Sequence, residues 1–233
     1  VLPGMVQHFD ISREKSVRAV ETAMMGDQKV YLVTQRNPQQ EVPTAADLYQ
    51  MGTVSQIKQI VKMPNGILRV MVEGLERAAL LTLFEDGQYL EAEIEDAPMQ
   101  EEQLSDTVKE AMSRIVKEKL EEFGNANPKA VKDFIGSLLV ITDLEPLLTQ
   151  TANEFPWDFA VKQELLECDY VSHLYDRIVY YLMREIEILM IKRDYQGKVK
   201  EHIDKNQRDY ILREELKVIR EELGEEDDET DSA

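Results

Sequence analysis

Few side chains in this sequence are of the types that perform acid–base, nucleophilic or metal chemistry, and they lie far apart. The three histidines, His8, His173 and His202, fall in separate predicted elements. The single cysteine, Cys168, has His173 five positions later, a spacing that does not place two side chains on one helix face. We therefore predict surface histidines and a buried or half-buried thiol rather than catalytic or metal-binding roles. One cysteine excludes an internal disulfide, which suits a reducing compartment.

Motifs for nucleotide or metal chemistry are missing from the sequence. A P-loop needs a glycine five residues before its Gly-Lys pair and a Ser or Thr after it. The Gly197-Lys198 pair has Lys192 and Val199 at these positions. No nucleophile elbow, His-Glu-x-x-His or Cys-x-x-Cys pattern occurs. The sequence therefore predicts no catalytic, cofactor-binding or metal-binding residue in this chain.

The charge balance is strongly acidic, with 46 acidic and 27 basic residues and a net charge of -19. Such a surface repels phosphate backbones and anionic lipid, so we expect neither nucleic acid nor a membrane as partner. No apolar run reaches the roughly 18–20 residues that span a bilayer. The first residues lack the basic and apolar regions of a secretory signal, and without an initiator methionine we expect a trimmed fragment.

Residues 1–97 show the pattern of strands. Lys29–Gln35 and residues 52–63 are rich in β-branched and aromatic residues, and Pro64-Asn65-Gly66 is a hairpin signal. In the strand that follows, side chains alternate between two faces, and the predicted buried face carries Leu68, Val70 and Val72. This period of two predicts an antiparallel sheet with one buried and one wet face.

One helix interrupts the predicted strands. Ser12 is the expected N-cap and Gly26 the expected stop. Arg13, Glu14 and Lys15 put three consecutive charges in its first turn. A solvated first turn is the simpler interpretation, and a contact with a partner protein is the alternative.

From about residue 99 the period becomes helical. The first apolar stripe consists of Leu104, Val108, Met112, Ile115 and Leu120. Phe155, Trp157 and Phe159 mark a corner, for which core packing is favoured over a binding pocket. Helical packing is likewise favoured over a partner surface for Tyr180, Tyr181 and Met183.

Residues 170–223 contain no proline and have two coiled-coil-like seams. The first seam is Ile178, Leu182, Ile186 and Leu189, and the second is Leu212, Leu216, Ile219 and Leu223. A continuous helix here would be about 80 Å long, with Gly197 as its weakest point. The second seam needs an apolar partner, so Tyr210, Leu212, Leu216, Ile219 and Leu223 are candidate partner contacts.

The predicted fold class is α+β. A small antiparallel β-rich subdomain with one helix spans 1–97, and a helical bundle spans 98–192. A coiled-coil-like extension of the long, projecting last helix spans 193–224, and a disordered acidic tail spans 225–233.

Several stretches together resemble the amino-terminal region of Lon-type ATP-dependent proteases. They are residues 2–6, 13–17, 52–54, 64–66, 69–78, 162–167 and 207–224. The run at 72–78 and the last motif are the most specific. The resemblance runs nearly end to end and is weakest over about 101–153.

The resemblance implies a substrate-recognition region that engages unfolded or degron-tagged proteins and supports a homo-hexamer. The family's ATPase module, with ATP and magnesium, and its serine–lysine protease module would follow Gly224. Proteolysis is thus assigned to a parent protein, and the bacterial cytoplasm is the expected location, with an organelle matrix as the alternative. A free-standing adaptor or scaffold is the competing hypothesis, and a nucleic-acid binder, disfavoured by charge, is the third.

Overall fold

A computed structural model of the chain describes residues 1–85 and 87–223, apart from the side chains of residues 65 and 221–223. The predicted acidic tail at 225–233 lies outside the described residues. The chain divides into two compact units, Val1–Met183 and a second unit that begins at Arg184.

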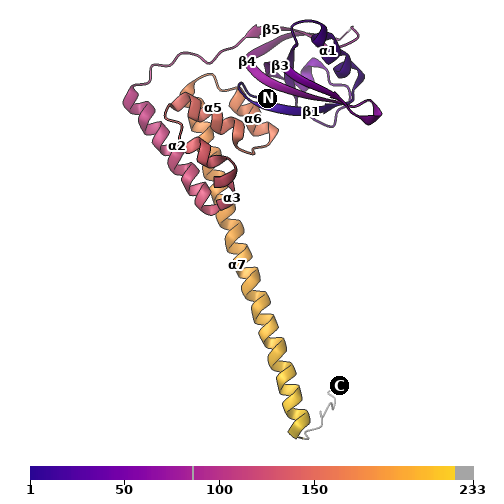
Figure 1. Cartoon of the computed structure of the whole chain (residues 1–233). Coiled ribbons are helices and arrows are strands. Elements are labelled where there is room, and N and C mark those ends of the chain that lie inside the picture. Colours follow the sequence, from indigo (N-terminus) through magenta and orange to yellow (C-terminus); the bar gives the residue numbers. More distant parts are fainter. Residues whose placement is uncertain (86, 224–233) are drawn as a thin grey trace. The chain divides into compact units, whose positions relative to one another are not determined.

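Among the described residues, five antiparallel strands form one sheet: β1 (Val6–Ile11), β2 (Lys29–Gln35), β3 (Leu48–Lys62), β4 (Leu68–Phe84) and β5 (Glu91–Asp96). The hydrogen-bonded order is β1-β4-β3-β2, and β5 also pairs with β4 (Figure 1). β1 runs along the first part of β4, from Ile11 opposite Leu68, and β5 along its second part, from Phe84 opposite Glu91. The predicted antiparallel sheet is confirmed.

The core of the strand-rich part lies between the sheet and helix α1 (Glu14–Met25). Val20 of α1 packs against one buried cluster of sheet side chains: Ile57, Leu68, Val70 and Val72. The predicted buried face of β4 is therefore confirmed. So is the hairpin, although its connection is a 3-10 turn over Pro64–Gly66, with Gly66 at φ +76°.

The predicted start of α1 is wrong by one position. Arg13, not Ser12, is the N-cap, and its side chain makes no capping hydrogen bond. The reason is β1, which the sequence analysis did not predict: Ile11 still pairs with Leu68, and the backbone stays extended through Arg13. The predicted stop at Gly26 is confirmed.

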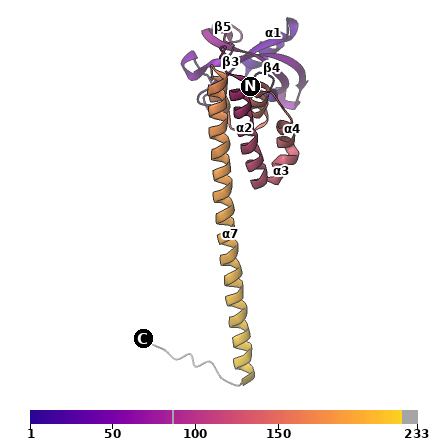
Figure 2. The ribbon, with the colours of Figure 1, turned by 90° about the vertical axis from the view of Figure 1, so that its left-hand side faces the viewer.

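Helices make up the rest of the first unit: α2 (Asp106–Ala126), α3 (Pro128–Ala130), α4 (Gly136–Leu139), α5 (Leu144–Glu154), α6 (Phe159–Leu166) and the start of α7 (Val171–Leu223). Figures 1 and 2 show α2 beside the first turns of α7. The buried face of α2 includes Val116, Leu120 and Phe123, whereas Val108 and Ile115 are exposed. The predicted stripe is therefore confirmed at Leu120 and wrong at Val108 and Ile115. The true face contains Ser113 and Gly124, small residues that hydrophobicity patterns do not count.

The aromatic corner between α5 and α6 is packed as predicted, except for one ring. Phe155 and Trp157 are buried and stacked with ring centroids 4.5 Å apart. Phe159 is 48% exposed. It is the first residue of α6, directly after the N-cap Asp158, and so lies outside the corner. Tyr181 is buried and donates to Glu164 Oε2 at 2.6 Å, while Tyr180 and Met183 are exposed.

Hydrogen bonds between residues far apart in sequence join the sheet, and the link that follows β5, to the helices of the first unit. Gln163 of α6 donates to the Met51 carbonyl at 2.9 Å. Ser172, at the start of α7, donates its hydroxyl to Glu102 at 2.7 Å, and its backbone N–H also binds this carboxylate. These two bonds hold the pKa of Glu102 below its usual range. The boundary after residue 97 stays a prediction, since Val1–Met183 forms one compact unit.

α7 is a single helix of 53 residues. It passes through Gly197 without interruption, and a Cβ added at Gly197 would meet no atom within 4 Å. Ile178 and Leu182 of the first predicted seam are fully buried within the first unit.

Candidate functional site

The histidines and the cysteine, which are the side chains considered for catalysis or metal binding, lie apart in the structure. His8 on β1 and His173 and His202 on α7 are all exposed. Cys168 is buried, its thiol donates to the Glu164 carbonyl at 3.3 Å, and burial raises its pKa. Within residues 1–85 and 87–223, no group of three His, Cys, Asp or Glu side chains is placed to hold a metal ion. None of the helices described there is long and apolar enough to cross a membrane.

The charged first turn of α1 makes local contacts. Arg13 donates to Gln35 Oε1 at 3.3 Å and to the Gln40 carbonyl at 3.0 Å. Lys15 donates to the Glu85 carbonyl at 2.8 Å, and Glu14 pairs with Arg18 one turn later. These contacts tie the helix start to neighbouring loops. A role in partner binding for Arg13, Glu14 and Lys15 stays a prediction.

The predicted second seam of α7 is an exposed apolar face. Leu212, Leu216 and Ile219 are 50–55% exposed and are spaced by four and three residues, which places them on one side of the helix. Tyr210 is also exposed, and the side chain of Leu223 lies outside the described residues. Their role as partner contacts stays a prediction.

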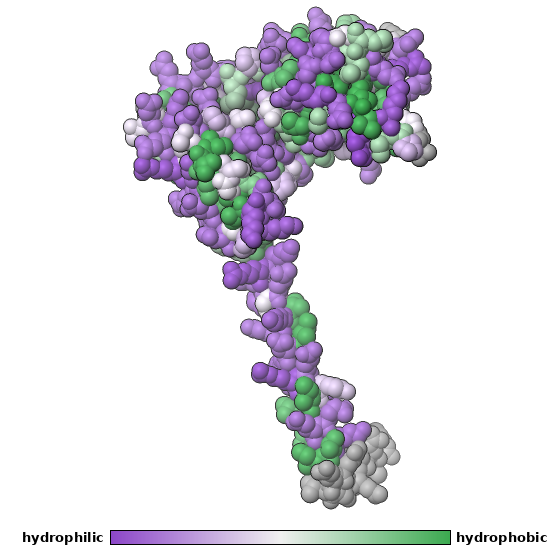
Figure 3. Space-filling model, in the orientation of Figure 1, coloured by the Kyte–Doolittle hydropathy of each residue, from purple (hydrophilic) through white to green (hydrophobic). Residues whose placement is uncertain are grey.

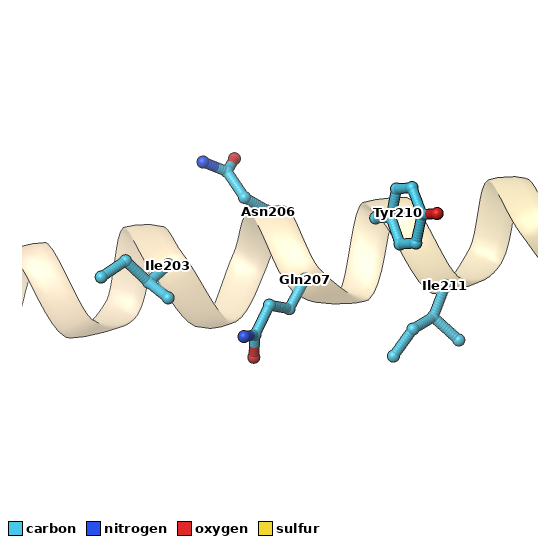
Figure 4. A pocket seen from close by; sticks show the side chains of 5 residues that line it. All are labelled: Ile203, Asn206, Gln207, Tyr210 and Ile211. Carbon is cyan, nitrogen blue, oxygen red and sulfur yellow. The ribbon is translucent and has the colours of Figure 1, made fainter.

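A second exposed apolar stripe on α7 was not predicted. It comprises Ile188, Ile191, Tyr195, Val199 and Ile203. At about 100° per residue, this stripe is centred roughly 110° around the helix from the Leu212 face. Figure 3 shows hydrophobic residues among hydrophilic ones along α7, and Figure 4 shows Ile203, Gln207 and Ile211 on one side of the helix. The three- and four-residue spacing could have revealed this stripe from the sequence.

A pocket of about 370 Å³ lies where the sheet meets the helices of the first unit; we call it the junction pocket. Its lining comes from the first residues of the chain, β4, the end of β5 and the link after it, α5, α6 and the start of α7: Leu2, Pro3, Leu75, Glu76, Arg77, Asp96, Pro98, Met99, Thr149, Ala152, Asn153, Leu165, Leu166 and Leu174. Most of these side chains are apolar. Sequence reasoning missed this pocket.

Gly74 allows the first residues of the chain to form one wall of the junction pocket. Its N–H donates to the Met5 carbonyl at 2.9 Å, and it accepts from the Gly4 N–H at 2.8 Å. A Cβ at position 74 would lie 2.2 Å from the Leu2 carbonyl oxygen. Only glycine therefore fits this close approach, which brings Leu2 and Pro3 against β4.

Arg77 joins β4 to the link between α6 and α7 beside the pocket. Its Nη1 donates to the Cys168 carbonyl at 2.6 Å and its Nη2 to Asp169 Oδ1 at 3.2 Å. The pocket is thus lined in part by residues of two of the stretches that carry the resemblance to Lon proteases, at the start of the chain and at 69–78. The sequence signal for the pocket was therefore the position of these lining residues within stretches that carry the family resemblance.

Comparison with known proteins agrees with the fold. A family model described as the ATP-dependent protease La (LON) substrate-binding domain matches residues 1–184. The chain is 42% identical to the Lon protease of Lachnoclostridium phytofermentans over 97% of this chain and 28% of that protein. For the Lon proteases of Azospirillum brasilense and Escherichia coli the identities are 35% and 33%, over 100% and 99% of this chain and 28% and 29% of theirs. The chain therefore spans less than a third of the length of these relatives.

Two solved structures share the fold. The amino-terminal domain of the Mycobacterium avium complex Lon protease superimposes with a TM-score of 0.59 at 19% identity. The Lon amino-terminal domain protein from Xanthomonas campestris gives 0.52 at 11%. Both superpositions cover 78% of this chain and 92% of the other. The expected resemblance and the α+β fold are confirmed, and the chain belongs to the Lon protease family, in whose members it corresponds to the amino-terminal region.

Proposed function

We propose that Val1–Met183 is a non-catalytic domain that binds unfolded or degron-bearing protein segments for a Lon-type protease. One observation carries the proposal: the family's substrate-binding-domain model ends at residue 184, and the compact first unit ends at Met183. The binding function thereby falls on one folded unit. The same unit contains an apolar pocket, and its strand β2 lies at the end of the strand order, where an extended peptide can add to the sheet.

We further propose that the rest of a parent protein supplies catalysis. The ATPase module would bind ATP and magnesium, and the protease module would act as a serine endopeptidase. The apolar faces of α7 would contact other copies in a homo-hexamer. We place the parent in the bacterial cytoplasm, and neither nucleic acid nor a membrane is a proposed partner, because the net charge is -19.

Retention of a model substrate tests the binding function. The chain is immobilised, and a reduced and carboxymethylated protein, which stays unfolded, is passed over it beside its native form. We expect the unfolded form to be retained more strongly, because it exposes apolar segments that the native form buries. Equal retention of the two forms would refute substrate binding by this domain.

A further inference from the structure

We propose that the junction pocket takes one large apolar side chain of an extended polypeptide and that its rim selects a lysine or arginine beside that side chain. The inference rests on the proposed substrate-binding function and adds a sequence preference to it. It concerns the pocket within the first unit, not the exposed faces of α7.

The size and lining of the pocket suit an apolar side chain. Its volume of about 370 Å³ is at the lower end of the roughly 300–1,000 Å³ range of ligand sites. Leu75, Leu165 and Leu174 reach it from β4, α6 and α7. Transfer of an apolar side chain from water into such a lining is favourable.

The walls are fixed by hydrogen bonds between distant parts of the chain. Asn153 Nδ2 donates to the Pro3 carbonyl at 3.1 Å, and Lys162 donates to the Asn153 carbonyl at 2.9 Å. Together with the contacts of Gly74 and Arg77, these bonds hold the pocket open before a ligand arrives. A preformed site binds with less loss of conformational entropy than one that must be ordered.

The rim carries uncompensated negative charge. Glu76 and Asp96 line the pocket and are exposed. Among the residues that the structure describes, neither takes part in a salt bridge. The basic residue of the lining, Arg77, is already engaged by Asp169 and the Cys168 carbonyl. A cationic side chain next to the bound apolar one would therefore be attracted, and an anionic one repelled.

Two lining residues also have unused hydrogen-bonding atoms. Arg77 Nε, a donor, and Asn153 Oδ1, an acceptor, are buried without a partner among the described residues. Both side chains are more than nine-tenths buried. Because both atoms are themselves buried, a bound peptide would reach them only after the surrounding side chains move.

Charge reversal at the rim tests the inference in the full chain. Three fluorescein-labelled unstructured peptides are compared, and their binding is followed by fluorescence anisotropy. Two have a central phenylalanine, flanked in one by two lysines and in the other by two glutamates. The third has a serine in place of the phenylalanine. We expect the lysine-flanked peptide to bind about fivefold more tightly than the glutamate-flanked one at low salt. The serine peptide should bind at least as weakly as the glutamate-flanked one. Glu76→Lys with Asp96→Lys should reverse the preference, and because both residues are exposed the fold should be retained.

Glu91→Lys with Glu93→Lys is the matched control, because these exposed β5 residues change the net charge equally but do not line the pocket. The control should keep the preference for lysine. Two results would overturn the inference if the chain still retains unfolded protein. One is an unchanged preference for the lysine-flanked peptide in the Glu76/Asp96 variant, and the other is a loss of that preference in both variants. If peptide binding does not depend on the flanking residues and a fatty acid displaces the peptide, the pocket is assigned to an acyl chain. That result would also overturn the inference. If the chain retains no unfolded protein at all, the proposed function fails as well.

Discussion

Arg77 of β4 donates from Nη1 to the carbonyl oxygen of Cys168, in the link between α6 and α7, at 2.6 Å. The two residues are 91 positions apart, and Arg77 is 7% exposed. Its second partner, the Asp169 carboxylate, has a half-exposed side chain. The buried hydrogen bond to the backbone, more than the ion pair, therefore links the sheet to the helices of the first unit.

Replacing Arg77 should destabilise this unit. Arg77→Met keeps much of the aliphatic volume but leaves the Cys168 carbonyl without its charged donor. We expect the free energy of unfolding to fall by about 2 kcal/mol, measured by urea denaturation. Arg69→Met is the control, because Arg69 forms a bidentate pair with Asp10 on the surface of the sheet. That variant should unfold close to the wild-type midpoint, and equal losses in the two variants would contradict the assigned role of Arg77.

The aromatic corner should show a similar contrast. Phe155→Ala removes a fully buried ring and should cost about 3–5 kcal/mol. Phe159→Ala, four residues later, removes a half-exposed ring and should cost much less. The single tryptophan, Trp157, stacks on Phe155, so its fluorescence reports the unfolding of this corner. Similar losses for both variants would mean that the ring burial is assigned incorrectly.

The sheet could be predicted largely from local patterns. Leu68, Val70 and Val72 alternate with Arg69, Met71 and Glu73, and only the first set faces the core. β1 was missed because its alternation is weak, and its place beside β4 depends on pairing with residues far along the chain. Most of the buried face of α2 was missed for another reason, although Leu120 was predicted correctly. It includes Ser113 and Gly124. At Gly124 a Cβ would lie 2.8 Å from the Val131 side chain, and a sequence pattern does not show that close approach.

The candidate site was less accessible to sequence reasoning. The Leu212, Leu216 and Ile219 face follows from helical spacing alone. The junction pocket does not, because its lining comes from residues between 2 and 174 that only the tertiary fold brings together. The glycine at position 74 was visible, but its reason, the 2.2 Å approach of the Leu2 carbonyl to a Cβ there, requires coordinates.

The Leu212 face leads to a prediction about assembly. Changing Leu212, Leu216 and Ile219 to aspartate places charge on the face that we propose to contact another copy. We expect a lower mass in sedimentation without loss of the first unit's cooperative unfolding. Val218→Asp is the control, since Val218 is equally exposed but lies more than 100° around the helix. Unchanged mass in the triple variant would show that copies of this chain do not associate through the face.

Alkaline pH should destabilise the first unit through two tyrosines. Burial, aided at Tyr181 by Glu164, raises the pKa of Tyr181 and of Tyr31 to about 12. An unfolded tyrosine titrates near pH 10. The folded state therefore favours the neutral form, and this stabilisation is complete below pH 10 and is lost as the pH rises towards 12. Tyr181→Phe should make the decline of unfolding free energy between pH 10 and 12 shallower, and an unchanged slope would contradict the assignment.

Hydrogen exchange tests the central claim, that the first unit binds unfolded protein, most directly. Exchange is measured on the whole chain with and without a saturating amount of reduced and carboxymethylated protein. We expect slower exchange within residues 1–183, strongest in peptides that contain residues 75–77 and 149–153, because a bound segment would cover the junction pocket. The account would be contradicted if hydrogen exchange slowed only in residues beyond Arg184, or did not slow anywhere at a saturating amount of unfolded protein.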